Sequence, residues 1–196
     1  MGLKLVKTET SGRIPVIIKG IEVATGGFKL VTTGLPANQL VPVGTPISCN
    51  EETRQAVVLK SAILASNVAD DAVEYPVKKG HFLVVGEYLG ASEGGAAYAI
   101  TEIDTSNAAY DVVTVGTTLG VALSAGAVLF KSSATGATAA ALHVAPTGLL
   151  WEDVKIEDNT SLSSLIRGTV YAKRIANGAH EAVRKALPLI VFSESY

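Results

Sequence analysis

The chain has few of the residues that mark a secreted, nucleic-acid-binding or membrane protein. Its single cysteine, Cys49, cannot form a disulfide within the chain and fits a reducing compartment. Charged residues are only 17% of the 196 and the net charge is −2, which disfavours the clustered lysines and arginines that bind phosphates. No apolar run reaches the roughly 18 to 20 residues of a membrane helix, and the first residues lack the pattern of a secretory signal. We therefore expect synthesis in a cytoplasm, with neither a nucleic-acid nor a membrane partner.

Motifs for catalysis, cofactors and metals are also missing. The chain has no phosphate-binding glycine loop, and its three histidines are far apart without a metal-ligand spacing. Residues 90–94, GASEG, fit the G-x-S-x-G pattern of a hydrolase, but that turn needs a helix after the serine, and further glycines and a β-branched run follow here. An esterase-like enzyme would need Ser92 close to a histidine. We therefore expect that the protein is not an enzyme and that it binds neither a cofactor nor a metal ion.

A short pattern that the chain does have occurs three times. Residues 40–47, 75–83 and 122–129 each place apolar residues on both sides of a glycine turn. Glycine allows the turn, and the flanking apolar residues can bury one face of the strands that it joins. The pattern predicts a mainly β fold, a compact β-barrel or β-sandwich, in one large domain or two small ones.

Local signals predict several elements of this fold. Extended runs at 14–18 and 28–31, with a Gly26-Gly27 turn between them, indicate two strands, and Pro15 places the first at a sheet edge. Two alternating segments, 98–103 and 110–115, predict a hairpin extension. Asn177 can cap a short C-terminal helix over 178–187, which Pro188 ends.

These elements suggest a domain division and a set of contact residues. Residues 1–33 form an N-terminal arm with edge strands, and residues 34–196 form a β-rich domain that a flexible loop near 132–148 could split. An edge strand beside an N-terminal segment is suited to pairing with another chain. Trp151 is a candidate interface residue, whereas Phe82, Tyr98 and Phe130 are expected in the core.

Two stretches resemble a known class of virion proteins. Residues 40–89, with Val43-Gly44-Thr45-Pro46-Ile47 and Gly86-Glu87-Tyr88-Leu89, and residues 166–192, with Lys185-Ala186-Leu187-Pro188, are similar to head decoration and head-fibre proteins of tailed bacteriophages and prophages. The resemblance implies a non-enzymatic structural protein that binds the capsid exterior, commonly as a homotrimer. The major capsid protein would be its partner, the capsid surface its location, and the host bacterial cytoplasm its place of synthesis.

The resemblance implies that the N-terminal arm could contact the capsid. The arm would add a strand to a sheet edge of the coat protein; its candidate residues are Lys4, Val6, Ile14, Val16 and Ile18, and Trp151 and Arg167 are candidates for a further interface. The region 98–130 departs from the smallest decoration proteins and leaves head fibre and capsid cement both open. A carbohydrate- or surface-binding β module of a bacterium is the alternative, which would be exported and would expose aromatic residues.

Overall fold

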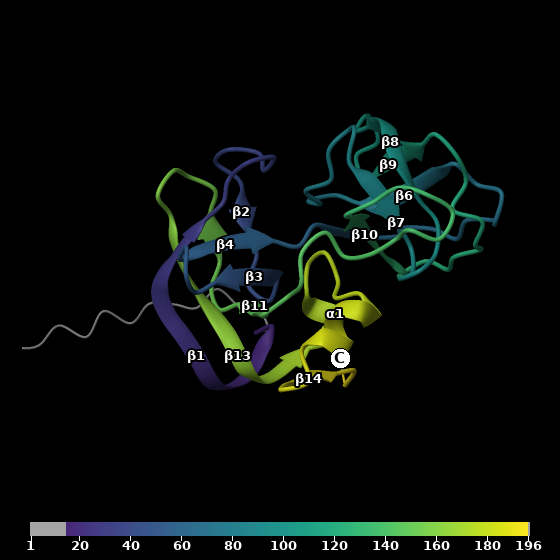
Figure 1. Cartoon of the computed structure of the whole chain (residues 1–196). Coiled ribbons are helices and arrows are strands. Elements are labelled where there is room, and N and C mark those ends of the chain that lie inside the picture. The colour runs from purple at the N-terminus through teal and green to yellow at the C-terminus, as the bar shows by residue number, and fades with distance from the viewer. Residues whose placement is uncertain (1–14, 196) are drawn as a thin grey trace, which may run out of the picture.

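The computed structural model describes residues 15–195 and has two lobes (Figure 1). The prediction of a mainly β fold with one short C-terminal helix is confirmed, with 44% strand, 5% helix and a closed five-strand barrel. The first lobe comprises residues 15–59 and 148–195, and the second lobe comprises residues 61–141. The second lobe is thus an insertion between two strands of the first.

The first lobe contains the closed barrel. Its strands follow the order β1 (Ile17–Leu30), β4 (Gln55–Val58), β3 (Pro46–Asn50), β11 (Gly148–Leu150) and β13 (Ser161–Tyr171), and β13 pairs back with β1. Strand β14 (Ile190–Ser193) adds to β13 in parallel, outside the closed barrel. A small ribbon of β2 (Leu40–Val41) and β12 (Val154–Lys155) accompanies it.

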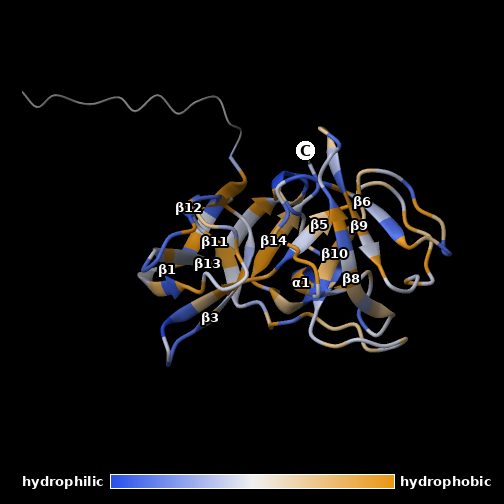
Figure 2. Cartoon of the chain, turned by 90° about the horizontal axis from the view of Figure 1, so that it is seen from above, coloured by the Kyte–Doolittle hydropathy of each residue, from blue (hydrophilic) through white to orange (hydrophobic). Residues whose placement is uncertain are grey.

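The second lobe is a six-stranded antiparallel sheet that curls on itself. Its order is β5 (Ser61–Ile63), β10 (Val128–Ser132), β7 (Tyr88–Gly90), β8 (Ala97–Asp104), β9 (Tyr110–Val115) and β6 (Glu74–Lys78), and a bridge between Leu64 and Val77 joins its two ends. The predicted hairpin is present as β8 and β9, with Asp104 accepting a hydrogen bond from the Ser106 N–H at 2.9 Å in the turn. Hydrophobic and hydrophilic residues alternate along the strands of both lobes (Figure 2).

The N-terminal strands differ from the prediction. The two expected strands with a Gly26-Gly27 turn are one continuous strand, β1, that pairs with β13 on both sides of the glycines. Gly27 has φ +79°, and the register against β13 shifts between Ala24 and Phe28. The glycines therefore form a bulge within a paired strand, because the long partner strand continues past them.

The C-terminal helix is shorter than predicted. Helix α1 spans Glu181–Ala186, and His180 rather than Asn177 caps it by accepting a hydrogen bond from the Ala182 N–H at 3.1 Å. Gly178 has φ +72°, a left-handed conformation that cannot belong to the helix. Asn177 is instead buried beside β5, where its carbonyl accepts a hydrogen bond from the Ser61 hydroxyl. A 3-10 turn, Ala172–Arg174, lies between β13 and this region.

The division of the chain at residue 33 and at the 132–148 loop stays a prediction. In the structure, residues 17–30 form the single strand β1, whose end at Lys29 and Leu30 pairs with β4 and closes the barrel. The segment after β10 packs back on the second lobe, since Gly136 bridges Ala97 and Ala140 is buried.

Candidate interaction surface

A three-stranded sheet extends below the closed barrel (Figure 1). Here β13 lies between the first part of β1 and β14, in a register that aligns Ile17 with Val170 and Phe192, and Lys19 with Thr169 and Val191. Val170 is fully buried, so the first of these rows faces the core, whereas Val191 is 60% exposed. One face of this sheet therefore packs inward and the other faces solvent.

Several predicted contact residues meet on this sheet. Ile18 lies in β1 and is 43% exposed, Trp151 lies just after β11 with its ring against Gly20 of β1, and Arg167 lies opposite Glu22 in register. A Cβ on Gly20 would come within 2.5 Å of the Trp151 ring, so glycine is required for this contact. The pairing of β1 with β13 thus places Arg167 beside β1, and the Trp151 ring packs against β1 at Gly20.

The remaining arm residues lie elsewhere. Val16 is half-buried and fills the space beside Gly44, where a Cβ would come within 2.6 Å of its side chain. Lys4, Val6 and Ile14 lie outside the described residues. Three exposed apolar residues of the sheet, Ile21, Leu189 and Val191, were not among the candidates. The sequence does contain a signal for Val191. It follows the buried Ile190 in a strand-like run, and neighbouring residues of a strand point to opposite faces of the sheet.

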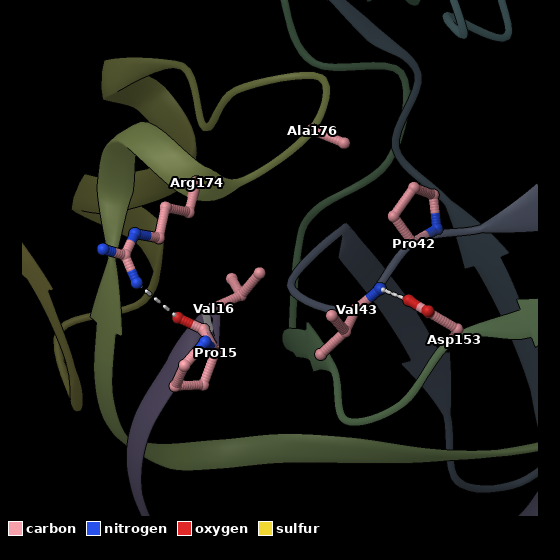
Figure 3. A pocket seen from close by; sticks show the side chains of 7 residues that line it. All are labelled: Pro15, Val16, Pro42, Val43, Asp153, Arg174 and Ala176. Atoms are coloured by element: carbon pink, nitrogen blue, oxygen red, sulfur yellow. Dashed lines mark hydrogen bonds between the residues drawn. The ribbon is translucent and has the colours of Figure 1, made fainter. Parts of the chain in front are cut away.

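A cleft of about 500 Å³ lies where the described chain begins (Figure 3). On one side, the Arg174 guanidinium donates to the Pro15 carbonyl at 3.2 Å and lies 4.3 Å from the Tyr171 ring centre. On the other, Asp153 accepts a hydrogen bond from the Val43 N–H at 2.7 Å. The cleft is lined by Pro15, Val16, Pro42, Val43, Asp153, Arg174 and Ala176. Apolar walls between a cation and an anion suit an extended polypeptide segment.

A buried ionic cluster joins the two lobes. Lys60, 4% exposed, donates to the Gly34 carbonyl of the first lobe at 2.7 Å and to Glu87 of the second lobe at 2.6 Å. Glu87 also binds Lys131 at 2.9 Å and accepts a hydrogen bond from the Val84 N–H. Although burial acts to raise the pKa of Glu87, the hydrogen bonds and charges of the two lysines outweigh it and hold the pKa below its ordinary value. Glu87 is therefore the ionised centre of this junction.

Two histidines lie near the junction. His180 stacks on Phe130 with ring centres 4.7 Å apart, and its Nε2 donates to the Ala91 carbonyl at 3.0 Å because Nδ1 accepts from Ala182. Burial, followed by the charge of Lys131, lowers the pKa of His143 to about 4. His180 thus attaches the C-terminal segment to the second lobe. In the return crossover the main-chain N–H of His143 donates to the Lys131 carbonyl at 3.3 Å, and the His143 imidazole is neutral at pH 7.

Acid should weaken the fold through His143. The pKa of His143 in the folded chain lies below its unfolded value, so the unfolded chain binds more protons and stability falls as the pH drops from about 6.5 to 4. The loss from this residue is about 2–3 kcal/mol. Urea unfolding at pH 7, 5.5 and 4.5 should show a smaller decrease for His143→Gln than for the parent. Equal decreases in both would contradict this role. Part of the remaining slope comes from the lowered pKa of His81, caused chiefly by burial, and at the lowest pH from that of Glu87.

Ser92 and His81 of the second lobe both lie outside its strands. Ser92 lies in a turn between β7 and β8, without the helix that a nucleophile elbow requires. His81 accepts a hydrogen bond from the Leu83 N–H, and its Nε2 lies 3.3 Å from Asp111, which also pairs with Lys79. Within residues 15–195 no three His, Cys, Asp or Glu side chains gather to hold a metal ion, and no helix has the length and apolar character to cross a membrane.

Comparison of the chain with protein-family models, curated proteins and solved structures finds no match.

Proposed function

We propose that the protein is a non-enzymatic structural component of a bacteriophage virion that binds the exterior of the assembled capsid as an oligomer, with the major capsid protein as its partner. The resemblance of residues 40–89 and 166–192 to head decoration and head-fibre proteins motivates the proposal. The observation that carries it is the sheet of β1, β13 and β14, which exposes Ile18, Ile21, Leu189 and Val191 and has Arg167 in its central strand. Binding through many such weak contacts gains strength from the repetition of sites on a capsid.

The proposal includes a role for the N-terminal arm in capsid binding. Residues 1–14 precede the cleft of Pro15 and Arg174 and carry Lys4, Val6 and Ile14. We propose that this segment contacts the coat protein by adding a strand to an open sheet edge, where backbone hydrogen bonds supply affinity. The trimer then presents three arms to neighbouring coat subunits.

Deleting residues 1–14 should abolish binding to heads while leaving the fold intact. The deletion removes none of the described strands, and it keeps Val16 and Ile17, which pack against the barrel. Loss of the arms from an oligomer lowers avidity by roughly 100-fold or more. Co-sedimentation with phage heads that lack the protein measures binding, and thermal unfolding measures the fold.

A variant that carries residues 1–14 in scrambled order is the matched control, since it keeps their charge and length. We expect it to bind as weakly as the deletion, because an added strand also needs the right side chains at alternate positions to fit the coat protein. Full binding by the deletion variant would contradict the role of the arm, and failure of the full chain to bind heads would contradict the proposed function itself.

A further inference from the structure

The sheet of β1, β13 and β14 has two open edges. Within residues 15–195, β14 pairs with β13 alone, and the stretch of β1 from Ile17 to Ala24 also has β13 as its only partner, since β1 meets β4 only at Lys29 and Leu30. The backbone N–H and C=O groups on the far sides of both strands are therefore available to a further strand. The two edges lie on opposite sides of β13.

Both edges carry exposed apolar side chains; β14 has neither a charged residue nor a proline, whereas the open stretch of β1 also carries Lys19 and Glu22. On β14 and directly before it, Val191 is 60% exposed and Leu189 is 55% exposed; on β1, Ile21 is 57% exposed and Ile18 is 43% exposed. Proteins normally place lysine or proline on an exposed edge strand to prevent pairing between molecules. Pro188 lies before β14, outside the strand, so it leaves the edge able to pair.

The charges around the two edges are complementary. Glu22 of β1 has Arg167 as its register partner, whereas Lys19 aligns with two uncharged residues, Thr169 and Val191. On the other side, Glu194 directly follows β14, is 55% exposed at its side chain, and pairs through one carboxylate oxygen with Arg184 of the same copy. Contact between the two different edges would bring Lys19 of one copy toward the carboxylate of Glu194 on another, which favours a second copy of this chain as the occupant.

We propose that β14 of one copy pairs with the open stretch of β1 in a second copy, so that Leu189 and Val191 cover Ile18 and Ile21. Because the contact joins two different edges, it is head-to-tail, and each copy keeps one edge for the next copy until the assembly closes as a ring. The inference rests on the proposed function, because the contact between β14 and β1 would build the capsid-bound oligomer. The oligomer can form without a capsid, so the inference is tested on the purified chain.

The first test places a charge on the open edge. Val191→Lys should reduce the mass of the purified full chain, measured by light scattering, from that of an oligomer to that of one copy, with an unchanged circular dichroism spectrum. Leu189→Lys should act in the same way. Val73→Lys is the matched control, because Val73 is 40% exposed in the second lobe and should leave the mass unchanged. A monomeric parent chain, or an oligomer that survives both edge variants, would overturn the proposal.

The second test separates the head-to-tail contact from a twofold one. In a Cys49→Ser background, Ile21→Cys copies mixed with Val191→Cys copies should be joined by a short bis-maleimide linker, while each variant alone should not be joined. Cross-linking of Val191→Cys alone would show two β14 edges in contact and overturn the proposal. The double variant should give a ladder that ends at the size of the ring.

Failure of this inference and failure of the proposed function give different results. A ring that the edge variants dissociate but that does not bind heads would leave the inference standing and contradict the capsid role. Undiminished head binding by monomeric Val191→Lys would show that the ring is not needed for the capsid role.

Discussion

Replacing Glu87 by alanine is expected to lower the free energy of unfolding by about 3–5 kcal/mol, because it leaves the buried ammonium of Lys60 without its carboxylate. Lys60 is 4% exposed and its remaining partner is the Gly34 carbonyl. Removing one member of a buried ion pair costs more than the pair contributes, since the other charge stays desolvated. Chemical denaturation of Glu87→Ala at pH 7 measures the effect.

The chain offers two matched comparisons for this experiment. Glu157→Ala removes an ion pair with Lys155 whose side chains are about half exposed, and it should cost less than about 1 kcal/mol. Replacing Lys60 and Glu87 together by methionine removes both charges and should restore most of the stability lost in Glu87→Ala. A loss in Glu87→Ala as small as in Glu157→Ala would show that water reaches the Lys60 ammonium.

The ion pair of Lys60 and Glu87 is a contact that the sequence predicts only in part. Lys60 lies in the apolar run 55–64, and a lysine in such a run signals a buried cation that needs a carboxylate. The signal does not say which carboxylate, because Glu87 is 27 residues away and approaches Lys60 only through the pairing of β10 with β5 and β7. The mainly β fold and the hairpin of β8 and β9 were predictable because alternation and turn residues are local properties.

The sheet that carries the interaction surface depends on contacts that are distant in the sequence. Gly20 pairs with Gly168, and nothing near residue 20 identifies that partner. The same long pairing turned the expected Gly26-Gly27 turn into a bulge, since β13 continues beside both halves of β1. Ile18, Trp151 and Arg167 could be selected one by one from the sequence, but their meeting on one sheet follows from this pairing.

Phe82→Ala is expected to be as destabilising as Glu87→Ala, for a different reason. Phe82 belongs to the segment after β6 in the second lobe, yet its side chain, 2% exposed, packs in the core cluster of the first lobe with Phe28, Leu30 and Val58. The next residue, Leu83, packs in the core of the second lobe. Truncating a buried phenylalanine costs about 3–5 kcal/mol through lost burial and the cavity left behind.

Because of the position of Phe82, its replacement should also change the number of unfolding transitions, which an ordinary core substitution would not do. Since it is the only residue of the second lobe in that cluster of described residues, its loss should uncouple the lobes, and calorimetry should resolve two unfolding transitions where the parent has one. Phe82→Leu, which keeps most of the apolar volume, should retain a single transition. Leu83→Ala should destabilise the second lobe while Phe82 still anchors it. One transition in Phe82→Ala would mean that the remaining contacts between the lobes, among them Lys60 with Gly34, Ser61 with Asn177 and His180 with Ala91, suffice to hold them together.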